Sequence, residues 1–221
     1  MGGKLKRLIF SNLLIGIIAV GIITGCTPAG GKSSSTSPAI TILSKEELDY
    51  FNGDDFFNGE YMNIRNQFLS SLYDSPEEID LFQLFYCGSG NPETPGELER
   101  EAVVSYNGWE DEPDTGCGKI SRTEMDSVLL KYMGLTVKDT KGVRLDEFTY
   151  LKEYDAYYHY HGDTNYRMEI LFTGGEKQED IIHLFYNDTF MGDGDKVLTL
   201  RKEGDGYIFI SNQKVKTING T

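Results

Sequence analysis

Two of the three histidines in this chain stand at alternate positions, in a stretch whose side chains could bind a ligand or a metal ion. If the stretch is a β-strand, His159 and His161 share one face with Asp155 and Tyr157, because side chains alternate between the two faces. Two imidazoles at this spacing can chelate one divalent ion, with Asp155 or Asp163 as a third ligand. A metal site formed by His159, His161 and Asp163 is therefore one hypothesis for this segment.

The same face has a second interpretation that needs no metal. A tyrosine ring can stack on a sugar or a peptide while its hydroxyl forms hydrogen bonds, so Tyr157, His159, His161 and Asp155 are predicted to bind a ligand. A plain sheet surface is the third interpretation, since tyrosine and histidine are ordinary residues of half-exposed strands. The sequence contains no GxSxG, P-loop, HExxH or dinucleotide-binding motif. We assign no catalytic residues and favour a binding protein over an enzyme.

Two other sets of residues could also contact a ligand. Trp109 begins an acidic loop that runs to residue 114, and we expect its ring to anchor the core, with a sugar-stacking platform as the alternative. Extracellular calcium would suit oxygen ligands on loops, although turn formation explains aspartate beside glycine without an ion. The aspartates in glycine-rich turns are Asp188, Asp193, Asp195 and Asp205.

The elements that position these residues change character near residue 147. Before that point, caps and apolar spacing predict helices over residues 44–51, 64–72, 75–86, 96–106 and 121–133. After it, alternating residues predict strands over residues 148–151, 155–161, 167–173, 180–187, 196–202 and 207–211. Glycine-rich turns, including one at residues 174–175, separate these strands.

This order of elements predicts the fold class. Helices followed by strands indicate an α+β domain, in which N-terminal helices pack on one face of a C-terminal antiparallel β-meander. A small cone-shaped α+β barrel of the nuclear-transport-factor kind is an alternative arrangement, and it hosts both binding proteins and enzymes.

The N-terminus has the features of an export signal. Basic residues lie within residues 4–7, an apolar run covers residues 8–23, and Ile23-Thr24-Gly25 leads into Cys26. This quartet resembles the lipobox of bacterial lipoproteins, in which the cysteine is diacylated and becomes the first residue after cleavage. The resemblance implies lipidation of Cys26, and two acyl chains make a stable membrane anchor. An uncleaved membrane span is the alternative.

The lipobox also defines the predicted organisation of the chain. Residues 1–25 form the signal peptide, and residues 26–43 comprise the lipidated cysteine and a flexible tether rich in serine, glycine and proline. A single globular α+β domain covers residues 44–212, and residues 213–221 form a C-terminal tail. We expect this domain to lie on the extracytoplasmic face of the cell membrane, held by its lipid.

The charge of the chain limits its partners. The full sequence has a net charge of −14. Because residues 1–25 carry three basic and no acidic side chains, the mature chain would hold 18 Lys and Arg against 35 Asp and Glu, a net charge near −17. Such a surface repels nucleic acid and anionic lipid headgroups. Glycans, peptides and proteins remain possible ligands.

Cys87 and Cys117 are the other thiols of the chain. Export would permit a disulfide between them, which could stabilise the domain by roughly 3–4 kcal/mol in the chain-entropy model. Two cysteines that never meet are the alternative, and both remain open from the sequence.

Several segments resemble an uncharacterised lipoprotein family of clostridia and related gut Firmicutes. In the helical half these are YFNG at 50–53, NIRNQFLSS at 63–71 and SPEEIDLF at 75–82. In the strand half they are EYDAYY at 153–158, HGDTNY at 161–166 and KVLTLR at 196–201. The resemblance covers residues 44–212 and implies a lipid-anchored domain of a Gram-positive cell. It implies no activity and no catalytic residues.

Two functions follow from these observations. The leading hypothesis is a lipid-anchored, non-catalytic domain that binds a glycan, a peptide or a partner protein at the cell surface. The alternative is a metal-dependent hydrolase of envelope or dietary polymers, in which His159 and His161 hold the ion that activates water. The first hypothesis needs no cofactor, whereas the second needs a divalent metal.

Overall fold

The computed structural model describes residues 38–59, 63–91, 93–162, 169–189, 192 and 194–215. They belong to one compact unit, Pro38–Thr221. The predicted signal peptide, Cys26 and most of the tether lie outside the described residues, so their predictions stay as they are.

Five α-helices were expected from caps and spacing, and five are found among the described residues. They are α1 (Lys45–Asn52), α2 (Ile64–Gln67), α3 (Leu81–Phe85), α4 (Glu97–Asn107) and α5 (Arg122–Met133). Ser44 forms the predicted capping box with Glu47 at the start of α1. Gly108 and Gly134 end α4 and α5 in the left-handed conformation, which a glycine adopts without steric cost.

The helix predicted over residues 75–86 is broken in two, which corrects the sequence-based prediction. Pro76–Glu78 forms a 3-10 turn, Ile79 is not helical, and α3 begins after Asp80. The Asp80 carboxylate accepts a hydrogen bond from the Gln83 N–H at 2.8 Å. It also forms an ion pair with Arg144, whose Nη1 is 3.0 Å away. Arg144, which is distant in sequence, thus helps to hold Asp80 as the N-cap of α3. The residues around Asp80 could not reveal this contact.

The strands form two antiparallel sheets. The larger has the order β1-β5-β6-β7-β8, with β1 (Thr41–Ile42), β5 (Phe172–Gln178), β6 (Ile181–Asp188), β7 (Gly194–Glu203) and β8 (Gly206–Lys214). The smaller has the order β2-β4-β3, with β2 (Gly116–Ser121), β3 (Thr149–Leu151) and β4 (Ala156–His161). The α+β class with a C-terminal meander, β5 to β8, is confirmed. The expectation of one continuous sheet is wrong, because β4 pairs with the unpredicted strand β2 instead of with β5.

The turn predicted at residues 174–175 is also wrong. Both glycines lie inside β5, and the chain reverses after it, where Glu179 has a positive φ of 54°. A side chain at Gly175 would place its Cβ 2.6 Å from Leu43 Cδ1 and 2.9 Å from the His183 carbonyl oxygen. Gly175 therefore permits a close approach within the sheet and does not form a turn.

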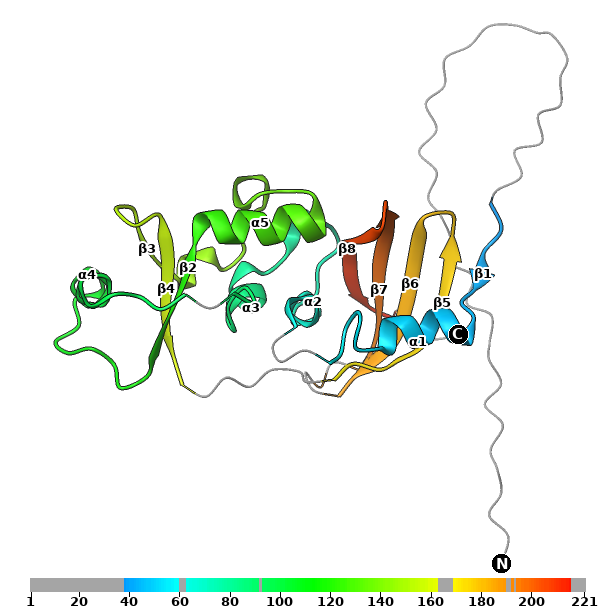
Figure 1. The fold of residues 1–221 in the computed structure, drawn as a ribbon, viewed down its shortest axis with the longest axis horizontal. Helices are drawn as coiled ribbons and strands as arrows, with labels where there is room; N and C mark the ends of the chain where they lie inside the picture. The colour runs from blue at the N-terminus through cyan, green and yellow to red at the C-terminus, as the bar shows by residue number, and fades with distance from the viewer. Residues whose placement is uncertain are drawn as a thin grey trace, which may run out of the picture. The chain divides into compact units, whose positions relative to one another are not determined.

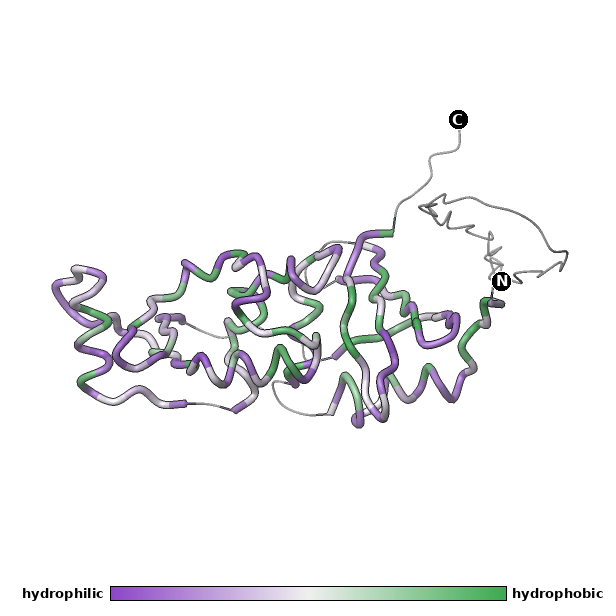
Figure 2. The backbone as a smooth tube through the Cα atoms, turned by 90° about the horizontal axis from the view of Figure 1, so that it is seen from above, coloured by the Kyte–Doolittle hydropathy of each residue, from purple (hydrophilic) through white to green (hydrophobic). Residues whose placement is uncertain are grey.

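The core lies between the large sheet and the helices, including α1, which contributes the buried Phe51. Rings pack tightly there, with Phe68 and Phe209 stacked at a centroid distance of 4.5 Å. Figure 1 shows the small sheet between α4 on one side and α3 and α5 on the other. Figure 2 shows hydrophobic and hydrophilic stretches alternating along the backbone throughout the domain.

One ion pair lies within the large sheet. Lys196 Nζ is 3.0 Å from Asp188 Oδ2, and both side chains are fully buried. Asp188 was one of the aspartates considered for calcium, and in the structure its carboxylate faces a lysine. Asp193 lies outside the described residues.

Candidate functional site

Strand β4 directs two of the predicted ligand-binding residues, Tyr157 and His159, to the interior. Tyr157 and His159 are only 7% and 8% exposed, and they face α3, α5 and the main core. Tyr158 on the opposite face is fully buried against α4. The expectation of an exposed polar face is therefore wrong for Tyr157 and His159, because helices cover both sides of the small sheet. His161, at the end of β4, is half-buried, and Asp155, just before the strand, is exposed.

His159 lies in an aromatic enclosure. Its Nε2 is 2.9 Å from the carbonyl oxygen of Tyr86, directly after α3, and the ring of Phe148 stands at a centroid distance of 5.0 Å. The two imidazoles stack, with His161 at 4.7 Å and an interplanar angle of 19°. On the strand side the ring packs on Gly118, where an added Cβ would lie 2.8 Å from His159 Cε1. The structure thus brings the two histidines together and fixes the first by packing.

Burial makes His159 a poor base. Desolvation, followed by the nearby His161, lowers the pKa of His159 to about 4, although the hydrogen bond to the Tyr86 carbonyl acts in the opposite direction. At neutral pH the ring is uncharged and Nε2–H donates to that carbonyl. Nδ1 is then the acceptor, and it is buried without a hydrogen-bond partner among the residues that the structure describes.

Asp155, one of the other predicted metal ligands, is not assembled with this pair. Asp155 precedes β4 in a turn, where its φ is 45° and its Oδ1 accepts a hydrogen bond from the Tyr150 hydroxyl at 2.6 Å. It is four residues from His159, or about 13 Å along an extended chain. Asp163 lies outside the described residues. Among the residues that are described, no group of three His, Cys, Asp or Glu side chains could hold a metal ion. The metal site with Asp163 stays a prediction.

The sequence left a disulfide and two separate thiols open, and the structure shows separate thiols. Cys87 and Cys117 are both free thiols. Cys117 pairs with Tyr160 across β2 and β4, and residues opposite each other in an antiparallel pair share a face. That face packs on α4, whereas Cys87 follows α3, on the other side of the small sheet. The sheet itself separates the two thiols, and burial raises the pKa of Cys87 to about 11.

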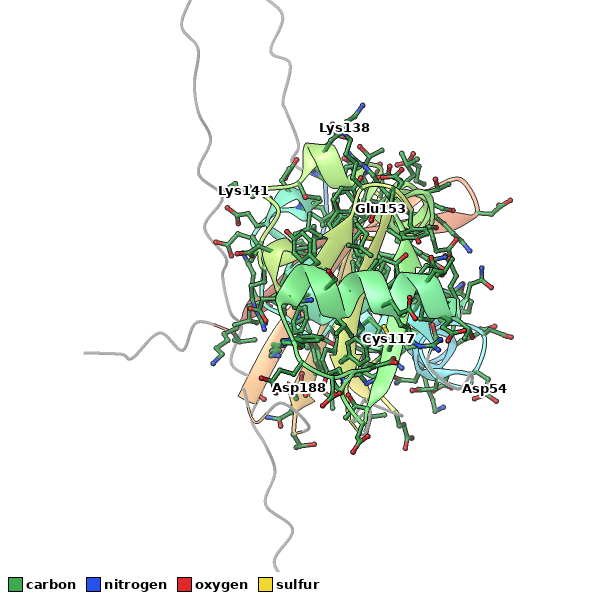
Figure 3. All side chains as sticks on the ribbon, turned by 90° about the vertical axis from the view of Figure 1, so that its left-hand side faces the viewer. Asp54, Cys117, Lys138, Lys141, Glu153 and Asp188 are labelled. Atoms are coloured by element: carbon green, nitrogen blue, oxygen red, sulfur yellow. The ribbon has the colours of Figure 1, made fainter. Side chains whose placement is uncertain are left out.

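A different surface carries the exposed aromatic residues of this part of the domain. Leu98 and Tyr106 on α4 are 72% and 68% exposed, and Trp109, just after the helix, is 41% exposed. We call these three side chains the α4 surface. Figure 3 looks onto α4, which runs across the front of the domain with Cys117 of β2 beside it. The prediction that Trp109 anchors the core is therefore wrong.

Trp109 is held rigidly although it is exposed. Gly108 adopts the left-handed conformation, and the Trp109 N–H bonds to the Val104 carbonyl at 3.1 Å, which closes the end of the helix. The Trp109 ring meets the Tyr160 ring edge-on at 5.6 Å. The Tyr160 hydroxyl donates to Glu112 Oε1 at 2.8 Å, and Arg100 Nε lies 3.0 Å from the same oxygen. The aromatic platform is thus fixed to both α4 and β4.

Carboxylates surround the α4 surface. Arg100 is the only basic residue between positions 97 and 118, and it is engaged by Glu112 and by the Pro95 carbonyl, the latter at 2.9 Å. The exposed acidic side chains of the helix and the following loop are Glu97, Glu101, Glu110, Asp111, Glu112 and Asp114.

The sequence of α4 contains a signal for this surface, because its apolar residues do not all lie on one side of the helix. Periodicity alone did not show which of these residues are buried in the core. Val103 is fully buried against β3 and β4, whereas Leu98, about 140° away around the same helix, is exposed. Apolar residues on two sides of an 11-residue helix indicate that one side has no partner within the domain.

Comparison with protein-family models, with curated proteins and with solved structures found no match for this chain. The resemblance to clostridial lipoproteins therefore stays a prediction. None of the described helices is long and apolar enough to span a bilayer.

Proposed function

We propose that this protein is a lipid-anchored, extracytoplasmic binding module of the cell membrane, and that the α4 surface is its binding surface. The N-terminal sequence supports the lipid anchor, because basic residues are followed by an apolar run and then by Cys26. The binding surface is supported by one observation above all. Leu98, Tyr106 and Trp109 expose apolar side chains on one short, rigid element.

The chemistry of this surface suits recognition. Tyrosine and tryptophan are enriched at the centres of protein interfaces, because they bury a large area at low cost in conformational entropy. The hydrogen bonds of Tyr160, Glu112 and Arg100 hold Trp109 in place before any ligand arrives. A preorganised aromatic side chain loses little freedom on binding, which favours affinity.

Two measurements test this proposal in the native cells. Labelled palmitate should enter the full chain and should fail to enter a Cys26→Ala variant; equal labelling of both would refute the anchor. A photo-crosslinking residue at position 106 should give a discrete adduct, whereas the same residue at position 130, an exposed leucine of α5, should give none. Absence of an adduct at position 106, or the same adduct at both positions, would refute the binding surface.

The metal-dependent hydrolase remains the alternative function. The burial of His159 and the use of its Nε2 by the Tyr86 carbonyl speak against it. Stoichiometric zinc or manganese in protein purified without chelators would support it.

A further inference from the structure

We infer that the α4 surface binds a cationic amphipathic helix presented by a partner protein. This inference rests on the proposed function, because it names the partner of the same surface.

The apolar side chains are spaced to receive another helix. Leu98 and Tyr106 are eight residues apart, which is about 12 Å along the axis of α4 and about 80° around it at 3.6 residues per turn, so the row they form crosses the helix obliquely. Trp109 extends this row beyond the end of the helix, where Gly108 turns the chain. A partner helix that carries apolar residues at i, i+3 or i+4, and i+7 would meet this row with one face, as amphipathic helices do in helix-binding proteins.

The charge around the row determines which helix fits. The flanking carboxylates, such as Glu97 and Glu101 on α4 and Glu110 and Asp111 in the loop, are exposed, and Arg100 is already paired with Glu112. Lysine and arginine on the flanks of a docked helix would meet these carboxylates, while acidic flanks would be repelled.

The same charge argues against other occupants. A second copy of this chain would oppose its own carboxylates, because a two-fold interface places the same patch on both sides. An anionic membrane surface would be repelled in the same way. A neutral glycan could stack on Trp109, but it would gain nothing from the carboxylates and would leave Leu98 uncovered.

Trp109 is the only tryptophan of the chain, so its fluorescence reports on this surface directly. The full chain in a nonionic detergent is titrated with a tryptophan-free helix of about 18 residues, built of leucine on one face and lysine on the other. We expect a saturable shift of Trp109 emission to shorter wavelength, because the partly exposed ring becomes covered. Raising the salt from about 0.05 M to about 0.5 M should weaken binding, because it screens the exposed charges.

Two control peptides separate the contributions of charge and shape. In the first, glutamate replaces every lysine; in the second, the same leucines and lysines are distributed around all faces of the helix. Neither should shift the emission. An equal response to the glutamate helix would overturn the inference, as would no response to the lysine helix.

Variants of the chain locate the contact. Leu98→Ser combined with Tyr106→Ser should weaken binding by roughly tenfold or more, as expected for central interface residues. Glu97→Gln combined with Glu101→Gln should weaken it and reduce its salt dependence. Leu130→Ser is the matched control, because Leu130 is a similarly exposed leucine on α5. Unchanged binding in the first pair, or equal loss in the control, would overturn the inference.

The failure of this inference differs from the failure of the proposed function. If a neutral oligosaccharide or an uncharged amphipathic helix shifts Trp109 emission while the lysine helix does not, the surface binds but its partner is not cationic. If the adduct at position 106 is absent from cells, the binding surface itself is rejected.

Discussion

Acidification should destabilise this domain through His159 in particular. The side chain is buried among Phe82, Tyr86 and Phe148 and stacks on His161. Protonation would place a positive charge in this enclosure, beside a second imidazole. The perturbation is therefore a fall in pH from neutral to about 4, where the folded ring begins to accept a proton.

The magnitude follows from the difference between the folded and unfolded states. The pKa of His159 is about 4 in the folded protein and about 6.5 in an unfolded chain. Between these values the unfolded state binds the proton and the folded state does not, so the free energy of unfolding falls as pH falls. The contribution of His159 is complete above about pH 6.5 and is lost by about pH 4. It amounts to about 3 kcal/mol, at about 1.4 kcal/mol for each pH unit.

Urea unfolding between pH 7.5 and pH 5, followed by Trp109 fluorescence, measures this effect. His159→Gln is the reference variant, because a glutamine amide can still donate to the Tyr86 carbonyl but does not titrate. Other groups also contribute to the pH dependence of stability, such as Glu47, whose pKa is lowered by its hydrogen bond with Lys177. Their contribution is the same in wild type and variant, so it cancels when the two free energies of unfolding are subtracted. Near pH 5 the wild type should lose about 1 kcal/mol more per pH unit than the variant.

A second variant tests the cause of the shift. His161→Gln removes a neighbouring positive charge, so the pKa of His159 should rise and the pH dependence should decrease. Parallel stability curves for wild type and His159→Gln would refute the reasoning, as would an NMR titration that places the pKa of His159 near 6.5.

Three further predictions concern the large sheet and the thiols. Lys196→Met should cost about 3–5 kcal/mol in urea unfolding, because it removes the ammonium group that is paired with the buried Asp188 carboxylate, and adding Asp188→Leu should recover most of that loss. Gly175→Ala should lower the free energy of unfolding by about 1–3 kcal/mol, since the new Cβ would lie 2.9 Å from a backbone oxygen. Gly174→Ala is the control, because its new Cβ would make only an ordinary contact at 3.9 Å. Equal melting temperatures of the two variants in thermal denaturation would contradict this account. Unfolded, unreduced protein that is acylated at Cys26 should give two reactive thiols with a thiol reagent, and a value of zero would show a disulfide.

Local patterns were sufficient for much of the secondary structure. The Ser44 and Ser121 caps and the glycines at positions 108 and 134 mark helix ends, because these residues satisfy or terminate backbone hydrogen bonds within a few positions. Alternation likewise located β4 and β6 to within one residue. Such features depend on neighbours along the chain, so the sequence carries them directly.

The pairing of strands could not be predicted from local sequence patterns. Gly174 and Gly175 resemble a turn, yet Gly175 serves a close approach of Leu43 and β6 within the sheet. Strand β2 was not predicted because its residues, Gly116–Ser121, show little alternation. Its pairing with β4 places Gly118 against the His159 ring, a contact between residues 41 positions apart.

The candidate site shows the same division. From the sequence alone come an N-terminal segment that resembles a lipobox, the acidity of the chain and the two histidines on one face of a strand. Tertiary structure decided that His159 is enclosed and that Trp109 is exposed. The physical reason is that alternation shows which side chains share a face, whereas burial depends on which distant element covers that face. Here α3 covers the histidines, and no described element covers the outer side of α4.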